Sequence, residues 1–135
     1  MKQKTFLVTG GTGFIGSNIS NLLVKKKYKV KIFDNNSRGK ISKIQKFKKE
    51  IRFIKGDIRN KKSLFKALKN TDAVIHLAYV NGTKYFYSKP VQILEIAIKG
   101  MLNVIDGCIK NNIKELYLAS SSEVYQTPNK ITTDE

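Results

Sequence analysis

Three glycines spaced three residues apart, Gly10, Gly13 and Gly16, are the first residues whose spacing indicates chemistry. They follow the apolar run at residues 6–8 and open a segment with helical spacing of apolar side chains. After a buried strand, the first glycine would let the chain turn sharply, the second would let a pyrophosphate approach, and the third would let the helix lie close to the strand. Free amides and the dipole at the helix start favour phosphate. A flexible glycine turn is the alternative, but the flanking patterns favour a dinucleotide site.

An acidic residue, Asp34, ends the next apolar run, about 20 residues beyond the glycines, where a ribose-binding carboxylate is expected. Its oxygens can accept from both hydroxyls of an adenosine ribose and would repel a 2′-phosphate, which favours NAD over NADP. The alternative is a turn-forming Asp at the head of Asp34-Asn35-Asn36. Arg38 follows closely in sequence and would tolerate a 2′-phosphate, so NADP stays open here.

Two further apolar runs also end in residues suited to a ligand site. Asp57 follows the run at residues 51–55, and it either contacts a cofactor or caps the next helix. Leu77 and Ala78 end the run that begins at residue 73. His76, in that same run, is the only histidine, and we expect it to be a structural residue.

Strand and helix patterns alternate along the chain and predict an α/β fold with a parallel sheet and right-handed crossovers. We expect a Rossmann-type doubly wound sheet of strand order 3-2-1-4-5, truncated after the fifth strand, with the ligand crevice where the order reverses. The expected strands are residues 6–8, 29–34, 51–55, 73–77 and 115–119, and the expected helices are residues 14–27, 41–47, 63–69 and 89–111.

The composition limits the other classes of function. With 26 Lys and Arg against 10 Asp and Glu, the net charge is +16, but the lysines are scattered and no nucleic-acid motif accompanies them. We therefore expect a solvated basic surface that speeds capture of anionic ligands, and no nucleic-acid partner. Cys108 is the only cysteine, so it is expected in the core, and no metal-ligand cluster is visible. The absence of a signal peptide or a long apolar run predicts a cytoplasmic protein with no membrane partner.

The segment Thr9–Gly16, with its G-x-x-G-x-x-G spacing, resembles the signature of the extended short-chain dehydrogenase/reductases, which include nucleotide-sugar epimerases and dehydratases. The resemblance implies that Asp57 accepts from the adenine amino group of NAD and that the next backbone amide contacts the ring. It also implies a nucleotide-sugar substrate and is compatible with a homodimer of the full-length protein. The motifs and the resemblance together predict these cofactor-binding residues: Gly10, Gly13, Phe14, Ile15, Gly16, Asp34, Asn35, Arg38, Asp57, Ile58, Leu77, Ala78, Ala119 and Ser120.

The segment at residues 119–125 is similar to the S-S-S-x-V-Y or S-T-S-E-V-Y segment of nucleotide-sugar enzymes. The resemblance makes Ser121 a catalytic residue that hydrogen-bonds the reacting sugar hydroxyl, a task for which a group that both donates and accepts is suited. Glu123 matches an acid or base used by the dehydratases and decarboxylases of the family. A serine-rich surface loop is the alternative interpretation.

The family's catalytic Y-x-x-x-K pair belongs in the helix after the fifth strand, and by family spacing it would lie beyond residue 135. We therefore expect residues 1–135 to form an incomplete NAD-binding domain without its C-terminal substrate portion. The alternative is a stand-alone NAD-binding or regulatory module. Tyr85 and Lys89 also match Y-x-x-x-K, but Pro90 follows directly. Because proline disfavours helical geometry in the residue before it, we expect a loop there rather than a catalytic helix.

Overall fold

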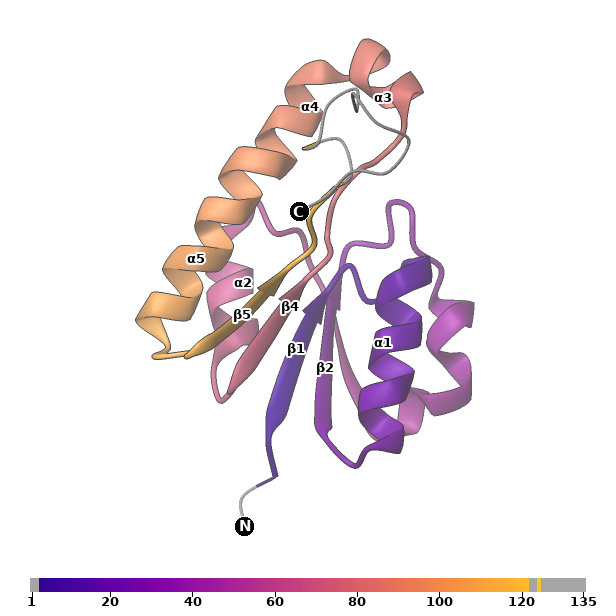
Figure 1. Ribbon diagram of the computed structural model, residues 1–135, viewed down its shortest axis with the longest axis vertical. Coiled ribbons are helices and arrows are strands. Elements are labelled where there is room, and N and C mark those ends of the chain that lie inside the picture. The colour runs from indigo at the N-terminus through magenta and orange to yellow at the C-terminus, as the bar shows by residue number, and fades with distance from the viewer. Residues whose placement is uncertain (1–2, 122–123, 125–135) are drawn as a thin grey trace, which may run out of the picture.

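Five parallel strands form one sheet with the order β3-β2-β1-β4-β5, which confirms the predicted topology. The computed structural model describes residues 3–121 and residue 124 (Figure 1). The strands are β1 (Thr5–Thr9), β2 (Lys29–Asp34), β3 (Ile51–Lys55), β4 (Ala73–His76) and β5 (Glu115–Leu118). The order reverses between β1 and β4, so the ends of these two strands flank the expected crevice.

Helices cover both faces of this sheet (Figure 1). On one side lie α1 (Phe14–Lys25) and a 3-10 segment, η1 (Ile41–Glu50). On the other side lie α2 (Lys61–Leu68) and α5 (Met101–Lys110). Each of these elements lies between two strands in sequence, as expected for crossover connections.

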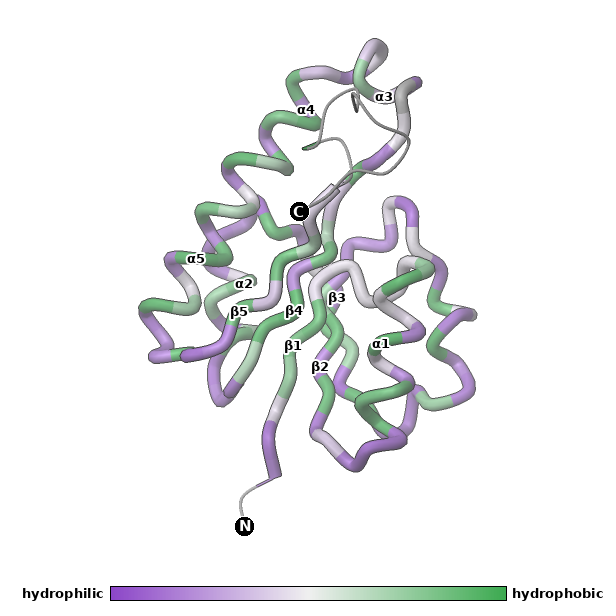
Figure 2. Tube along the Cα trace, in the orientation of Figure 1, coloured by the Kyte–Doolittle hydropathy of each residue, from purple (hydrophilic) through white to green (hydrophobic). Residues whose placement is uncertain are grey.

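Two apolar clusters hold the layers together, one on each face of the sheet. Leu7 and Phe33 pack into the cluster under α2 and α5, whereas Val8 and Ile32 pack into the cluster under α1 and η1. Successive residues of a strand face opposite ways, so β1 and β2 need apolar residues at consecutive positions (Figure 2). Cys108 lies in the first cluster, as predicted, and burial raises the pKa of its thiol.

The segment before β5 differs from the single helix predicted over residues 89–111. It contains α3 (Thr83–Ser88), α4 (Pro90–Leu94), a π-helical segment, η2 (Glu95–Gly100), and then α5. The loop expected around Tyr85 is wrong, because residues 83–88 form a short helix. The predicted break itself is confirmed, since Lys89 has φ −146° and ψ 52° and Pro90 starts α4. Proline restricts the residue before it and has no N–H to donate.

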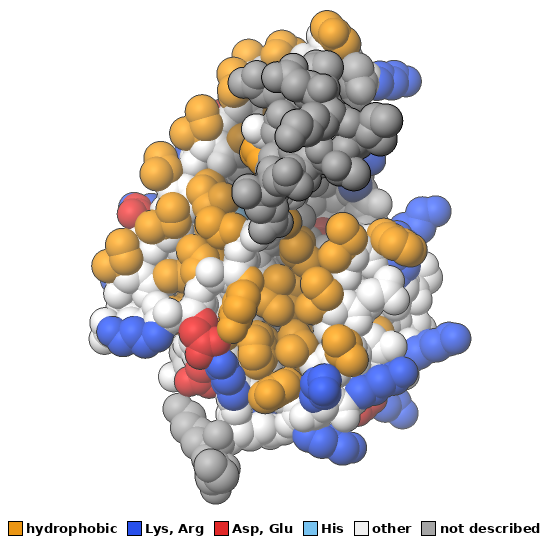
Figure 3. Space-filling model, in the orientation of Figure 1, with side chains coloured by type: hydrophobic (Ala, Val, Ile, Leu, Met, Phe, Trp, Pro, Cys, Tyr) orange, Lys and Arg blue, Asp and Glu red, His pale blue; other side chains and the backbone are white. Residues whose placement is uncertain are grey.

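A broad apolar surface lies between α1 and α5, over the front of the sheet (Figure 3). Tyr117 of β5 is 51% exposed and Leu22 of α1 is 54% exposed. In the described part of the chain, no helix covers β4 and β5 on this side (Figure 1). No helix in that part combines the length and the apolar character needed to cross a membrane.

Candidate cofactor-binding site

The turn after β1 is closed by backbone contacts that require glycine. Gly10 has φ +69°, in the left-handed region, and its N–H donates to the Phe33 carbonyl at 3.0 Å. A Cβ on Gly10 would lie 2.8 Å from the backbone of Leu77 and Ala78, so the ends of β1 and β4 touch at this point. A side chain at position 10 would clash with the end of β4, and the two strand ends would have to move apart.

Gly16 allows α1 to start directly against this turn. A Cβ there would lie 2.3 Å from the Gly10 carbonyl oxygen, so the predicted close approach is to the turn rather than to the strand. The Ser17 N–H donates to the Gly13 carbonyl at 3.1 Å. The amides of Phe14 and Ile15 precede that bond, and the first amides of a helix have no carbonyl partner within it. Both residues are exposed, and free amides at a helix start favour an anion.

Asp34 joins the glycine turn to the end of β2. Its buried carboxylate accepts from the Thr12 N–H at 3.0 Å and from the Asn36 N–H at 2.8 Å, one bond to each oxygen. The turn-forming role and the cleft position therefore occur together. A carboxylate has about four lone-pair sites, so each oxygen keeps room for one ribose hydroxyl.

Thr12 is a structural residue of the glycine turn that the sequence analysis missed. It is fully buried, its hydroxyl donates to the Asn36 side-chain oxygen at 2.9 Å, and its carbonyl accepts from the Lys40 N–H. Thr12 thus links the glycine turn to the loop after β2. A hydroxyl inside an otherwise glycine-rich turn is the signal that could have revealed it.

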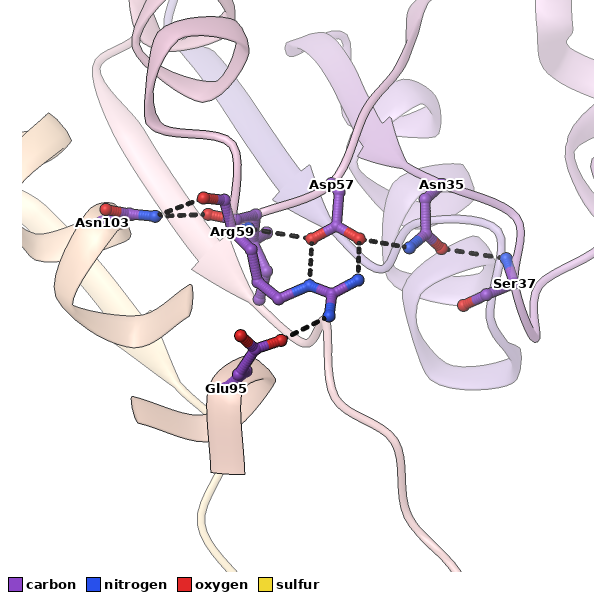
Figure 4. A network of polar contacts seen from close by, with 7 residues as sticks. Asn35, Ser37, Asp57, Arg59, Glu95 and Asn103 are labelled. Atoms are coloured by element: carbon purple, nitrogen blue, oxygen red, sulfur yellow. Dashed lines mark hydrogen bonds and ion pairs between the residues drawn. The ribbon is translucent and has the colours of Figure 1, made fainter. Parts of the chain in front are cut away.

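Asp57 is surrounded by donors (Figure 4). One oxygen accepts from the Arg59 backbone N–H at 2.9 Å and from its Nε at 3.0 Å, while the other accepts from Arg59 Nη2 at 2.9 Å and from Asn35 Nδ2 at 3.0 Å. The Arg59 hydrogen bonds hold the pKa of the Asp57 carboxyl at about 2. The alternative helix-cap role is wrong, because Asn60 caps α2 by accepting from the Ser63 N–H.

Two residues distant in sequence fix the loop that carries Asp57. Asn103 of α5 is buried, and its Nδ2 donates to the carbonyls of Ile58 and Arg59 at 2.9 and 3.1 Å. Glu95 accepts from Arg59 Nη1 at 3.0 Å. The sequence analysis gave neither residue a role, since their contacts depend on how the helix packs against the loop.

His76 is structural, as the sequence predicts. The Thr9 hydroxyl accepts from the N–H groups of Leu77 and Ala78 at 3.1 and 3.2 Å and lies 2.7 Å from His76 Nδ1. With both lone pairs occupied, the hydroxyl donates to Nδ1, which assigns the proton of the neutral ring to Nε2. Burial lowers the pKa of His76 to about 4, so the ring stays neutral.

Arg38 reaches across the cleft mouth to the segment after β4. Its Nη1 donates to the Asn81 carbonyl, and its guanidinium lies 5.1 Å from the centroid of the Tyr85 ring. Both contacts direct the charge of Arg38 toward the opposite side of the cleft.

A cleft lies at the carboxyl ends of the strands. Predicted residues that line it are Gly10, Gly13, Asp34, Asn35, Arg38, Asp57, Ile58, Leu77 and Ala78. Those that do not line it are Phe14, Ile15, Gly16, Ala119, Ser120 and Ser121, while Glu123 lies outside the described residues. Lining residues that the sequence analysis missed include Phe33, Ser37 and Ile96.

These groups fit a dinucleotide. The turn has no Cβ where a pyrophosphate would pass, the first amides of α1 follow it, and Asp34 has acceptor capacity for a ribose. Within residues 3–121 and residue 124, no group of three or more His, Cys, Asp or Glu side chains could hold a metal ion.

The comparison with known families agrees with this geometry. Residues 6–135 match the model of the NAD dependent epimerase/dehydratase family. This chain belongs to that family. The family's NAD dependence gives the cleft a cofactor class.

Individual relatives in the family include several nucleotide-sugar enzymes. The chain is 35% identical over 123 residues to a UDP-N-acetyl-alpha-D-glucosaminuronate decarboxylase of Bacillus cytotoxicus, covering 91% of this chain and 38% of the relative. A structure of UDP-N-acetylglucosamine 4-epimerase from Methanobrevibacter ruminantium matches with TM-score 0.87 and 36% identity, covering 99% of this chain and 43% of that one. The Thermus thermophilus UDP-glucose 4-epimerase, solved with NAD, matches with TM-score 0.87 and 29% identity over 97% and 42%. The chain thus spans about two fifths of the length of these relatives.

Proposed function

We propose that this chain is the N-terminal, NAD-binding part of a nucleotide-sugar epimerase, dehydratase or decarboxylase. The observation that carries the proposal is the Asp34 carboxylate, which lines the same cleft as Gly10 and Gly13 and has acceptor capacity left. The nucleotide-sugar relatives, each more than twice as long as this chain, support both the substrate class and the N-terminal assignment.

When bound, NAD would accept a hydride from the sugar carbon that bears the reacting hydroxyl. Ser121 follows β5 at the edge of the sheet where the cleft lies, because all five strands run parallel. In this proposal its hydroxyl holds the sugar hydroxyl as that group loses its proton. Glu123 would act as acid or base only in an elimination or a decarboxylation.

The domain proposed for residues 1–135 is incomplete on its own. Within the 135 residues no Y-x-x-x-K follows β5, so the proposed role is cofactor binding, with catalysis in the longer protein. The exposed apolar side chains over β4 and β5 support this proposal, since a further layer would bury them. The same missing motif favours the second candidate, an NAD-binding or regulatory module without turnover.

The homodimer expected for the full-length protein stays a prediction. A row of exposed apolar residues along α4, η2 and α5 supports it, because these side chains recur at helical spacing on one face. The members of that row are Val91, Leu94, Ile98, Leu102 and Ile109.

The proposed function is tested by titrating NAD and NADP against the wild-type chain and Asp34→Ala in a calorimeter. We expect NADP to bind at least about tenfold more weakly than NAD, because a 2′-phosphate would meet the Asp34 carboxylate. Arg38, held at Asn81 and Tyr85, would offset little of that repulsion. Asp34→Ala should weaken NAD binding and narrow the difference between the Kd values of NAD and NADP. Tighter binding of NADP by the wild type would contradict the proposal and make Arg38 the deciding residue.

A further inference from the structure

The Asp57 carboxylate has no acceptor site left for a ligand. It accepts four hydrogen bonds, two on each oxygen, from the Arg59 backbone, Arg59 Nε, Arg59 Nη2 and Asn35 Nδ2. A carboxylate has about four lone-pair sites, so the set is full. An amino group arriving from the cleft must therefore replace one of these donors.

The four donors are not equally replaceable. Three belong to Arg59, whose guanidinium is also held by Glu95 at 3.0 Å and whose carbonyl is held by buried Asn103 at 3.1 Å. The two guanidinium bonds also join opposite charges, with Nη2 2.9 Å from the Asp57 oxygen, which makes them stronger than a bond from a neutral amide to the same carboxylate. Asn35 is a neutral, exposed amide, and its other side-chain bond is from the Ser37 N–H to its Oδ1 at 2.9 Å.

The same donor is also the one on the ligand side. Asn35 and Asp57 both line the cleft, whereas Arg59 is absent from its lining. A group that enters the cleft reaches the Asn35 bond without disturbing the Asp57 and Arg59 pair. The amide of Asn35 thus has the same chemistry as an exocyclic amino group, an N–H donor aimed at Asp57 from the cleft.

We propose that Asn35 is a specificity-setting residue whose amide occupies the Asp57 position that an adenine amino group needs, so that the dinucleotide displaces it on binding. This inference rests on the proposed function. Because one donor is exchanged for another, the amino group contributes little net affinity in the wild type. Removing the Asn35 amide leaves the position to water, and the amino group then gains a full net hydrogen bond.

The test compares NAD with nicotinamide hypoxanthine dinucleotide, which carries a carbonyl oxygen in place of the adenine amino group. In Asn35→Ala we expect the Kd of NAD to fall roughly three- to tenfold, the value of one net hydrogen bond, and the Kd of the hypoxanthine dinucleotide to stay the same. Asn18→Ala is the matched control, since Asn18 is an exposed amide on α1 that donates to the Phe14 carbonyl outside the cleft lining.

Asn35→Ala also removes the acceptor for the Ser37 N–H, so a second variant separates this effect. Asn35→Ser keeps a hydroxyl that can accept from that N–H but is too short to reach Asp57. Equal gains for NAD in the Ala and Ser variants support the inference. The inference is overturned if both dinucleotides gain affinity, if only the Asn35→Ala variant gains affinity for NAD, or if the variants bind NAD more weakly. If the wild type binds NAD but no variant changes the ratio of the two Kd values, only this inference fails. If it binds neither dinucleotide, the proposed function fails as well.

Discussion

Single side chains at the ends of the strands each serve a backbone contact as well as the cleft. Asp34 holds two loop amides while keeping acceptor capacity, and Thr9 holds two amides after β4 while donating to His76. The carboxylate and hydroxyl suit this because each offers more lone pairs than one partner uses. The site is therefore shaped before any ligand arrives.

The buried His76 should make the protein acid-sensitive in a defined range. Its pKa is about 4 in the folded chain against 6.5 for an exposed histidine, so only the unfolded state takes up the proton between these values. The free energy of unfolding should fall by up to about 3 kcal/mol as pH drops from 6.5 toward 4, with stability fully present above pH 6.5. Urea titrations at several pH values measure this.

His76→Gln is the control, because His76 is the only histidine and most carboxylates titrate below about pH 5. The variant should lose the slope between pH 5 and 6.5, even if its overall stability is lower. An identical slope in both proteins would show that the ring is not the group that titrates.

Ser121 belongs to the chemistry rather than to the cofactor in our proposal. In a chain extended to the length of the relatives, Ser121→Ala should lower kcat by roughly 10²- to 10⁴-fold with NAD affinity little changed. Glu123→Gln should lower the rate only if the reaction is an elimination or a decarboxylation. An unchanged rate for Ser121→Ala would remove this residue from the site.

At the scale of elements, a lysine inside the sheet fixes the end of a helix. The Lys31 ammonium of β2 donates to the carbonyls of Lys69 and Asn70, which directly follow α2, and to the Thr71 hydroxyl. A positive charge at a helix C-terminus also interacts favourably with the helix dipole. Burial and the neighbouring Arg52 lower the pKa of Lys31, so its charge is kept at some cost.

Lys31→Met should therefore destabilise the fold by about 1–2 kcal/mol, because the Met side chain keeps the apolar length but leaves the carbonyls without their donor. Urea unfolding measures the change. Lys29→Met, on the same strand and exposed, should change stability by less than about 0.5 kcal/mol. Equal losses of stability in the two variants would mean that removal of a positive charge, rather than loss of the contacts at the helix end, is responsible.

At the scale of the whole molecule, the Y-x-x-x-K match at Tyr85 and Lys89 lies between β4 and β5 rather than after β5. Tyr85 lies in α3, before the crossover helix, and Lys89 leaves helical geometry ahead of Pro90. Their side chains therefore do not share one regular helix face. The ring of Tyr85 instead contacts the guanidinium of Arg38.

Residues 1–135 alone should accordingly be inert toward nucleotide sugars. The measurement is to supply NAD with a panel of UDP-sugars and to follow NADH absorbance and sugar products, with no signal expected above the protein-free rate. Tyr85→Phe is the informative variant, since it removes the hydroxyl but keeps the ring against Arg38. Turnover in the wild type that disappears in this variant would make the Tyr85 segment catalytic.

Sequence reasoning captured the helix starts and strand ends better than the segment between β4 and β5. Periodic apolar runs and Pro90 are local signals, so the strands and the break at Lys89 follow from them. The short helix at residues 83–88 and the π-helical segment at residues 95–100 were not predicted. At Gly100 in the latter, a Cβ would lie 2.4 Å from Ile58 Cδ1, a packing constraint that no local pattern contains.

The sequence by itself determined the strand order, the glycine turn and the position of Asp34, because these follow from apolar periodicity and from spacing along the chain. Only the tertiary structure decided how the polar side chains pair. Asn35 meets Asp57 across 22 positions and Arg38 meets Asn81 across 43. Such pairs depend on which strand ends lie side by side and where each side chain points. The hydrogen bond by which Asn35 occupies the last acceptor position of Asp57 is therefore a property of the folded chain alone.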